Sequence, residues 1–481
     1  MRASVTDSSL SPCLLTANGE RVKVVDWYGF CLMARWSLPS TERLVSYVLV
    51  RDGGWNKPNI LPRRAGVACS ASGKALHFEH GGSGCLAVHD NENLILLLFL
   101  EQPPEKRPCL NDPSVVDLRT FGVLPDAPGL QTERIQAALH AVATDEGRKT
   151  LLMPTGVYRS GSLHLPSGLN WYFDEGAVLK ASDNLEDLTR DPLPGPYGRR
   201  VFLSACQARD VTLRGPGILD GNGLVLRAQS GRGRQVQSRF GPVDSERVVN
   251  LQFAHCRQVQ VQDLYSVNSS SWNIVPYACD NIRFERVKII GNMQWKNDDG
   301  IDPDSCRDLV VSHCFIMARD DAIVLKTCGS VNGALISPDG GSRDMCRIRI
   351  ARNLLWSGTA AMKYGYNESE AGEVHDVEWT GNDIIQTREG VQLMLASKAR
   401  VSDFRFHGNH YERCTRQNYR LLAPGVRNIS FTDEVHEALG CIDSEVQGER
   451  VTFNALRIAG RAISSLEEGR MAGQTGTVLF H

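Results

Sequence analysis

Short segments with one pattern recur along the chain from about residue 210: a polar residue, an apolar residue, any residue and a second apolar residue. The successive spacings between them are 48, 23, 27, 39, 29, 27, 25 and 22 residues, and 48 is close to two periods. A strand repeated at such a period, without intervening helices, is typical of a solenoid, in which stacked coils build the core. The first apolar residues of these segments are Val211, Val259, Ile282, Leu309, Ile348, Val377, Phe404, Ile429 and Val451.

The period favours one kind of solenoid over its main alternative. A β-propeller blade needs about 40–45 residues and four strands. One strong strand in about 25 residues is better explained by a parallel β-helix, an all-β fold. Asn, Asp or Gly directly before a strand predicts a left-handed or turn conformation at each corner of a coil.

One amphipathic helix is predicted before the repeats, over residues 133–145. Ile135, Ala138, Leu139 and Val142 fall at i, i+3, i+4 and i+7, and Thr132 is available as the N-cap. We expect this helix to cap the N-terminal end of the β-helix and to cover its open strand edges.

The first part of the chain has a different pattern. Alternating segments such as RVKVVDWY and RLVSYVLV are broken by turns such as DGGWNKPN, which predicts a small β-sandwich-like domain. The apolar run Leu94–Leu100 indicates a buried strand and is too short to span a bilayer. The proline-rich stretch Glu101–Pro113 then predicts a boundary between domains at 1–112 and 113–481.

Charge and cysteine content exclude several classes of function. Lysine and arginine number 53 against 55 aspartates and glutamates, for a net charge of −2, so no basic excess favours nucleic acid or a membrane surface as a partner. The 14 cysteines lack the spacing of a disulfide framework or a zinc site, and the N-terminus lacks an apolar signal segment. We expect reduced core cysteines and a cytoplasmic chain, with export by another route as the alternative.

Aspartates are crowded into two stretches, NDDGIDPDSC (Asn297–Cys306) and ARDDAIVLKT (Ala318–Thr327). Residues one coil apart in a β-helix stack about 4.8 Å apart. Asp299 and Asp320 are 21 residues apart, so we expect both on one face of neighbouring coils, with Asp321 beside them. Asp302 and Asp304 are assigned to corner turns, with substrate contact as the alternative.

Converging carboxylates suit glycoside hydrolysis. One protonated carboxyl donates to the leaving oxygen while ionised neighbours activate a water, and in inverting enzymes the two carboxyls lie about 6.5–9.5 Å apart. Aspartates also end strands and bind Ca²⁺. The residue pattern by itself therefore leaves catalytic, structural and calcium-binding interpretations open.

The chain from about Val116 to Val451 resembles the polygalacturonase family of glycoside hydrolases, family 28. GPGILDGNG resembles the family's GxGxIDGxG segment, NDDGIDPDSC its NTDGID motif and RDDAIVLKT its GDDCIAIKS motif. The resemblance implies a right-handed parallel β-helix and hydrolysis of an oligo- or polysaccharide by an inverting mechanism, with no metal or organic cofactor. It implies Asp320 as general acid, Asp299 and Asp321 as the residues that deprotonate water, and Asn297 as an orienting residue. Asp298 replaces the family's usual threonine.

Departures from the family pattern bear on the substrate. Ala360 stands where the family has a histidine, and Gln392 and Met394 stand where it has the arginine and lysine that hold a galacturonate carboxylate. A glutamine cannot replace the charge of a bidentate arginine. We therefore expect a neutral sugar, with hydroxyls bound by Gln392, and no polygalacturonase activity.

Other residues are candidates for sugar contact. Lys326 and Lys363 could bind substrate or be solvated charges on the surface. Trp356, Tyr364 and Tyr366 could form a stacking platform for a sugar ring or pack between coils. A β-sandwich before a β-helix is also similar to the dextranase and isopullulanase relatives, whose sites use three aspartates.

Two other functions remain open from the sequence. One is a polysaccharide lyase or epimerase on the same fold, against which the missing arginine and lysine argue. The other is a glycan-binding solenoid without turnover, against which the retained aspartates argue.

Overall fold

The chain folds as two compact units, Met1–Lys106 and Arg107–His481. The division lies six residues before the predicted boundary between residues 112 and 113. The computed structural model describes residues 13–27, 29, 31–38, 44–102, 107–145, 147, 149–190, 199–230, 235–238, 241–244, 247–327, 330–331, 334–335, 343–365, 373–394, 400–422, 426–473 and 477–481.

The N-terminal unit contains two five-stranded sheets, ordered β2-β1-β5-β8-β7 and β3-β4-β10-β9-β6. Alternation along the strands buries one face: in β5, Val45, Tyr47 and Leu49 are buried. Residues of both sheets, among them Leu15 and Leu98, share one apolar core, as the predicted β-sandwich requires. The strands are β1 (Cys13–Ala17), β2 (Glu20–Val22), β3 (Val24–Trp27), β4 (Cys31–Ser37), β5 (Val45–Arg51), β6 (Pro58–Leu61), β7 (Cys69–Ser72), β8 (Ala75–His80), β9 (Gly84–Asp90) and β10 (Asn93–Glu101).

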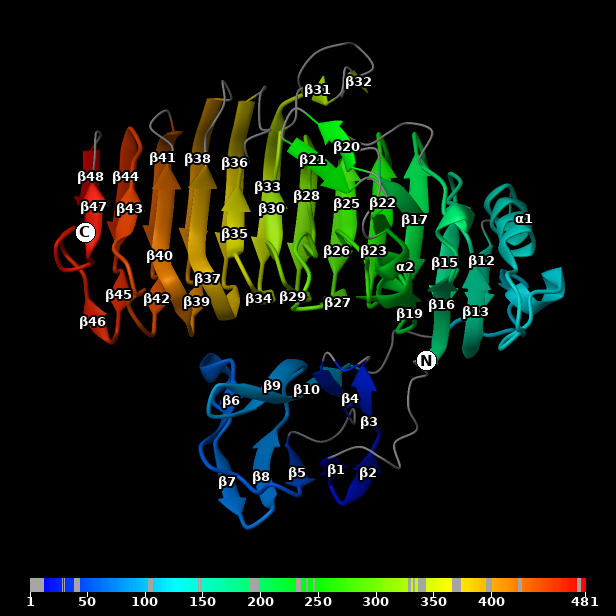
Figure 1. Ribbon diagram of the computed structural model, residues 1–481, viewed down its shortest axis with the longest axis horizontal. Coiled ribbons are helices and arrows are strands. Elements are labelled where there is room, and N and C mark those ends of the chain that lie inside the picture. The colour runs from blue at the N-terminus through cyan, green and yellow to red at the C-terminus, as the bar shows by residue number, and fades with distance from the viewer. Residues whose placement is uncertain are drawn as a thin grey trace. The chain divides into compact units, whose positions relative to one another are not determined.

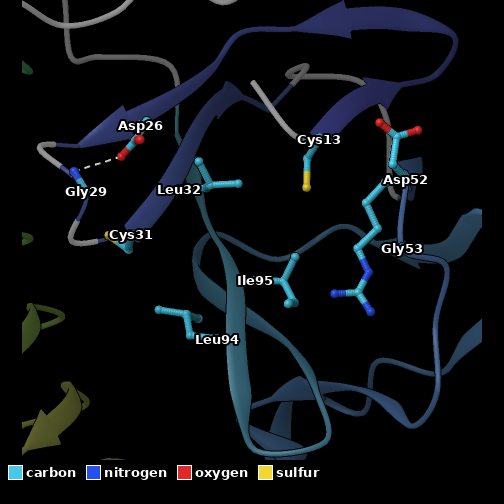
Figure 2. Close-up of a pocket in the computed structure, with 10 residues that line it drawn as sticks. Cys13, Asp26, Gly29, Cys31, Leu32, Asp52, Gly53, Leu94 and Ile95 are labelled. Atoms are coloured by element: carbon cyan, nitrogen blue, oxygen red, sulfur yellow. Dashed lines mark hydrogen bonds between the residues drawn. The ribbon is translucent and has the colours of Figure 1, made fainter. Parts of the chain in front are cut away.

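A cavity of about 420 Å³ opens in this unit, lined by residues from strands of both sheets. Figure 2 shows Cys13 and Asp52 on one side of it and Leu94 and Ile95 on another, with the Gly29 N–H donating to Asp26 Oδ1 over 2.9 Å. None of its described lining residues is aromatic. The cavity therefore offers no stacking surface for a sugar ring.

The second unit is a parallel β-helix with three walls (Figure 1). The first wall is a 13-stranded sheet. Its strands are β11 (Val115–Asp117), β12 (Thr150–Met153), β15 (Asn170–Phe173), β18 (Arg209–Arg214), β23 (Arg257–Gln262), β26 (Asp280–Glu285), β28 (Arg307–Ser312), β33 (Met345–Ala351), β36 (Glu373–Thr380), β38 (Arg400–His407), β41 (Val426–Thr432), β44 (Arg450–Asn454) and β48 (Thr477–Phe480).

The second wall follows the first in each coil. It consists of β13 (Gly156–Ser160), β16 (Ala177–Ala181), β19 (Ile218–Asp220), β24 (Tyr265–Val267), β27 (Lys288–Ile290), β29 (Phe315–Ala318), β34 (Leu354–Ser357), the first part of β37 (Asp383–Met394), β39 (His410–Tyr411), β42 (Val435–His436), β45 (Arg457–Ile458) and β46 (Arg461–Ala462).

The third wall carries the acidic motifs. It contains β14 (Leu163–His164), β17 (Arg200–Cys206), β22 (Val248–Ala254), β25 (Ile274–Tyr277), β30 (Ile323–Leu325), β35 (Ala360–Tyr364), the last part of β37, β40 (Cys414–Leu422), β43 (Ser444–Val446) and β47 (Met471–Gly473). Between β25 and β30, residues 299–305 bridge to both neighbouring coils at Ile301 and Asp304. Main-chain hydrogen bonds to both coils continue through this segment, so the crowded aspartates lie on a continuous part of the third wall.

The predicted repeat is confirmed residue by residue in the first wall. All nine first apolar residues, from Val211 to Val451, lie directly opposite one another on successive strands. In eight of the nine segments the preceding residue has a φ of +54° to +58°; six of these residues are Asp or Asn, such as Asp210 and Asn281. These short polar side chains adopt the left-handed conformation at low cost, as predicted.

One spacing was misinterpreted. Val211 pairs directly with Val259, so the 48 residues between them form one enlarged coil, not two. The additional residues contain α2 (Gly223–Ser230) and a hairpin of β20 (Gln235–Ser238) and β21 (Gly241–Asp244). A second insertion, containing β31 (Ser330–Val331) and β32 (Ala334–Leu335), enlarges the coil before Ile348.

The amphipathic helix forms as α1 (Thr132–Ala143) at the N-terminal end of the coils (Figure 1). It buries the four predicted apolar residues. The predicted N-cap is wrong: Gln131 occupies that position, and the Thr132 hydroxyl instead accepts a hydrogen bond of 2.8 Å from the Gly161 N–H. Among the described residues, no helix has the length and apolarity needed to cross a bilayer.

A polar ladder runs through the interior beside the second wall. The Asn353, Asn382 and Asn409 side chains each donate to the next one along, over 2.9, 2.8 and 2.9 Å, and the last donates to Glu434. All four residues are buried. A buried amide is tolerated because each partner satisfies the next.

The described cysteines all have free thiols, as predicted. Seven of them are buried, four are partly exposed, and Cys109 and Cys441 are exposed.

Candidate active site

The three predicted carboxylates meet where the coils enter the third wall. Oxygen atoms of Asp299, Asp320 and Asp321 all lie within 4.8 Å of one another. The Gly300 N–H donates to the Asp321 carbonyl over 2.9 Å, and the Ala322 N–H donates to the Ala360 carbonyl over 3.0 Å. These main-chain bonds stack three successive coils at the site.

The register of this stack differs by one residue from the expected one. Ile301 pairs with Ile323, so Asp299 lies over Asp321, 22 residues away, and Asp298 lies over Asp320. The Asp320 N–H accordingly points to the Asp298 carbonyl, at 3.3 Å. The three carboxylates still converge because Asp320 turns its side chain toward the same group.

Gly300 makes the close approach of these coils possible. A Cβ at this position would lie 2.3 Å from the Ala322 carbonyl oxygen and 2.4 Å from the Ile316 side chain. Any side chain would therefore push apart the coils that carry Asp299 and Asp321. This is a physical reason for the glycine inside NDDGID.

The spacing of the carboxylates is shorter than expected. Oxygens within 4.8 Å of one another are closer than the roughly 6.5–9.5 Å of typical inverting pairs. The reason is that neighbouring coils are only about 4.8 Å apart, and two of the three carboxylates are adjacent in sequence.

Asp299 is the most isolated of the three. It is 4% exposed, and its Oδ1 has no hydrogen-bond partner among the described residues. Burial, together with the negative charges of Asp302 and Asp320, raises the pKa of the Asp299 carboxyl well above its ordinary value. An unpaired buried carboxyl oxygen is costly, so this atom is suited to hold a water or a sugar hydroxyl.

Asp321 is held as an anion. Its Oδ2 lies 2.7 Å from the Lys363 ammonium, and its Oδ1 accepts from the Thr359 hydroxyl at 2.6 Å and the Ala360 N–H at 3.3 Å. Burial alone would lower the pKa of Lys363, but the charge of Asp321 and the hydrogen bond raise it above its ordinary value. The pair is therefore charged on both sides.

Asp320 is the only partly exposed member of the three. Its Oδ2 accepts the Asn297 N–H at 3.0 Å, and its Oδ1 lies 3.0 Å from Thr359 Oγ1. Asn297 has a φ of +58°, and its side-chain oxygen accepts from Arg247 at 2.5 Å. Asn297 thus orients Asp320 through its main chain, and Arg247 fixes its side chain.

The comparisons with known proteins agree with this architecture. The family model of glycosyl hydrolases family 28 matches residues 145–341, which include all three aspartates. The chain is 28% identical over 230 residues to a probable polygalacturonase of Vitis vinifera, covering 44% of each protein. It is 24% identical to an endo-polygalacturonase of Pectobacterium carotovorum subsp. carotovorum, covering 40% of this chain and 51% of the relative. The chain is therefore similar to glycosyl hydrolases family 28 over residues 145–341.

Comparison with solved structures extends the similarity over a larger part of the chain than the sequence relatives cover. The family 28 exopolygalacturonase of Yersinia enterocolitica matches with a TM-score of 0.56 at 14% identity, covering 88% of this chain and 91% of that one. The polygalacturonase of Erwinia carotovora ssp. carotovora matches with a TM-score of 0.51 at 17% identity, covering 78% of this chain and 99% of that one. At these identities the likeness establishes the fold, a right-handed parallel β-helix. The chain spans about half the length of the curated relatives it matches.

Four residues that were considered as surface charges or turn residues are buried at the site: Lys326, Lys363, Asp302 and Asp304. The Lys326 ammonium lies 2.6 Å from Asp302 Oδ2 and 3.8 Å from the centre of the Trp272 ring. Burial raises the pKa of Asp302 to about 6, although Lys326 acts in the opposite direction. The assignment of Asp302 and Asp304 to corner turns was wrong, because both are buried. The main chain of Asp304 pairs with Tyr277 on one side and with Lys326 on the other. The alternative of a solvated lysine is wrong for Lys326 and for Lys363.

Asp298, the departure from the family threonine, is fully buried. Its carboxyl accepts the Asn273 side-chain amide at 3.0 Å and the Asn292 N–H. Burial raises its pKa well above the ordinary value. Asp298 therefore ties the turn that carries Asp299 to two neighbouring segments.

Gln392 lies on the third wall between Lys363 and Arg420 of the neighbouring strands. Its amide donates to Glu389 Oε2 over 2.5 Å, and Glu389 also accepts from Arg416 at 2.9 Å. Sequence reasoning missed Glu389 and Arg416. No strand pattern predicted the contact between Glu389 and Gln392, because side chains three residues apart on a strand point to opposite faces.

The aromatic candidates do not form a sugar platform. Tyr364 is fully buried in the coil core, 5.7 Å from the ring of Phe404, and Trp356 is buried as well. Tyr366 lies outside the described residues. Sequence reasoning also missed Thr359, whose hydroxyl contacts two of the three aspartates.

Proposed function

We propose that this chain hydrolyses O-glycosidic bonds of an oligo- or polysaccharide, using Asp299, Asp320 and Asp321. One observation carries the proposal: oxygens of three carboxylates lie within 4.8 Å of one another, and in the described part of the chain a buried oxygen of one of them, Asp299, has no hydrogen-bond partner. Such crowding costs free energy in a folded protein and is typical of a site for proton transfer. The family match and the names of the relatives support the reaction class.

The environments of the three carboxyls support different roles. Asp320 is partly exposed and can reach a leaving oxygen, which suits the general acid. Asp321 is an anion held by Lys363, and Asp299 has a raised pKa and therefore greater basicity once ionised. These two suit the residues that hold and deprotonate the attacking water.

Inversion of configuration is the outcome we expect despite the short spacing. A retaining mechanism needs a carboxylate free to attack the sugar carbon. Asp321 has both oxygens engaged, by Lys363, Thr359 and the Ala360 N–H, and Asp299 is buried with a raised pKa. Neither is a good nucleophile, so direct attack by water is favoured.

Product stereochemistry tests this mechanism. We expect the first product seen by proton NMR, before mutarotation, to have the anomeric configuration opposite to that of the bond cleaved. Retention would overturn the mechanism and leave the reaction class intact. An unsaturated product that absorbs ultraviolet light would instead indicate a lyase and overturn hydrolysis.

The charge at the Gln392 position supports a neutral sugar as substrate. The residue pairing with Lys363 is an amide, and beside it lies the buried carboxylate of Glu389. A uronate carboxylate placed there would face a negative group whose partners, Arg416 and Arg420, already lie 2.9 and 3.6 Å from it. The named relatives are polygalacturonases, so an uncharged chain with the same linkage is the sharpest probe.

Three substrates that differ only in charge test the preference: polygalacturonate, its methyl ester and its carboxyl-reduced form. We expect kcat/KM for the two uncharged chains to exceed that for polygalacturonate at least about tenfold, which corresponds to about 1.4 kcal/mol. Replacing Gln392 by arginine should narrow the difference. Faster cleavage of polygalacturonate than of both uncharged chains would contradict the neutral-sugar proposal.

A further inference from the structure

The Thr359 hydroxyl lies between two of the three carboxyls. Its Oγ1 is 3.0 Å from Asp320 Oδ1 and 2.6 Å from Asp321 Oδ1. Both distances are those of hydrogen bonds. A hydroxyl has only one proton, so it can donate to only one of the two carboxyls.

The second contact is a full hydrogen bond, and not a share of one proton, only if a carboxyl donates it. The shorter contact is to Asp321, whose anion is already stabilised by Lys363 at 2.7 Å and the Ala360 N–H at 3.3 Å. The hydroxyl donates there, and its lone pair faces Asp320 Oδ1. Only a protonated Asp320 can complete that contact, because a carboxylate has no proton to donate.

We propose that Thr359 is a positioning residue that places the acid proton on Asp320 and keeps Asp321 ionised. The inference rests on the proposed hydrolytic function and deepens it. When a sugar binds, the Asp320 proton passes from its contact with Thr359 Oγ1 to the glycosidic oxygen, whose bond to the sugar carbon breaks. Asp321 accepts a proton from the water whose oxygen forms the new bond, so charge and protons balance.

The main chain fixes Thr359 in this place. Its N–H donates to Ser357 Oγ over 3.0 Å, and Ser357 Oγ donates to the Asp320 carbonyl over 2.6 Å. Its carbonyl accepts from the Arg388 and Glu389 N–H groups over 3.0 and 2.8 Å. The hydroxyl is therefore held between two coils and cannot easily turn away from the carboxyls.

Other charged groups also face Asp320 and Asp321 and affect their protonation. They come from the coils on either side and are Asp298, Asp299, Asp302, Lys326 and Lys363. Thr359 differs from all of them because it does not titrate. Ala360, at the position expected for the family histidine, cannot titrate either. Thr359 and Ala360 therefore place the proton on Asp320 without an ionisable side chain of their own.

The pH–rate profile of Thr359→Val tests the proposal. Valine matches threonine in shape but lacks the hydroxyl. The protonated form of Asp320 and the anion of Asp321 each lose a partner, so the alkaline limb should move down and the acidic limb up, each by about 0.5–1 pH unit. The bell-shaped pH–rate profile therefore becomes narrower on both its acidic and its alkaline side. Thr359→Ser keeps the hydroxyl and should restore the width.

A purely structural role for Thr359 would give a different result. It would lower the rate at all pH values and leave both limbs in place, and that outcome overturns the proposal. Thermal unfolding of each variant separates this case from loss of folding.

A second measurement needs no turnover. In protein labelled with carbon-13 at the aspartate carboxyls, Asp320→Asn identifies the Asp320 signal. We expect the two assigned signals, Asp320 and Asp321, to titrate closer together in Thr359→Val than in the unmodified protein. Unchanged titration curves overturn the proposal even if the chain cleaves glycans. Absence of cleavage with the expected curves overturns only the hydrolytic function.

Discussion

Asp320→Asn lowers kcat by about 10²–10⁴-fold, the usual contribution of a general acid, with little change in KM. Asparagine keeps the size of the side chain and can still accept the Asn297 N–H, but it has no carboxyl proton to donate to a leaving oxygen. A substrate with an activated aryl leaving group needs little protonation, so its cleavage should fall much less. Steady-state kinetics on a polysaccharide and on an aryl glycoside measure both effects.

The matched control is Asp308→Asn. Asp308 pairs with Arg347 on the exposed first wall and has a φ of +56°, which asparagine also tolerates. We expect kcat to stay within about twofold, because surface ion pairs contribute little. Equal losses in the two variants would contradict the role of Asp320. Binding of glycan without turnover in the unmodified chain would favour a glycan-binding solenoid.

Phe431→Ala destabilises the β-helix by about 3–5 kcal/mol. Phe431 is fully buried in a stack of rings on the first wall, with its centroid 4.6 Å from that of Phe406 and 4.9 Å from that of Phe453. The loss removes contacts on both sides, and the neighbouring coils cannot close the gap without breaking their hydrogen bonds. Urea unfolding of the chain, followed by circular dichroism, measures the change.

Leu439→Ala is the control for this prediction. Leu439 is exposed, so its truncation should change the free energy of unfolding by less than about 0.5 kcal/mol. If Phe431→Ala were equally mild, the aromatic stack would not be what holds these coils together.

The first wall could be predicted closely because one physical constraint acts on every coil. Each strand must place its apolar residue over that of the preceding coil, and a left-handed residue must precede it, so the pattern is repeated in the sequence. The insertion between Val211 and Val259 shows where the number of coils cannot be predicted from the spacing of the repeats. A segment that leaves the wall and returns adds residues without adding a coil, and its length happens to equal about two periods.

The site was predictable only in part. Asp299, Asp320 and Asp321 share a coil spacing and stand in recognisable motifs, so their convergence follows from the fold. The register differs by one residue because this coil has 22 residues, as the pairing of Ile301 with Ile323 shows, and not the 21 that separate Asp299 from Asp320. Thr359 could not be predicted in the same way, because it contacts the aspartates across an enlarged coil. Glu389 could not be predicted either, because its contact with Gln392 does not follow the alternation of side chains along a strand.

The ladder from Asn353 to Glu434 has a direction, and this limits how the protein can be lengthened. Each amide donates toward the C-terminus and accepts from the N-terminal side, and Glu434, which also accepts from the Tyr411 hydroxyl, only accepts. A duplicated coil carrying an asparagine can be inserted within the row before Glu434, because its amide accepts from the preceding asparagine and donates to the next member. Beyond Glu434 the same asparagine would face a carboxylate, which has no side-chain N–H to donate. The row of side-chain donors therefore ends at Glu434, and the solenoid has a preferred place to grow.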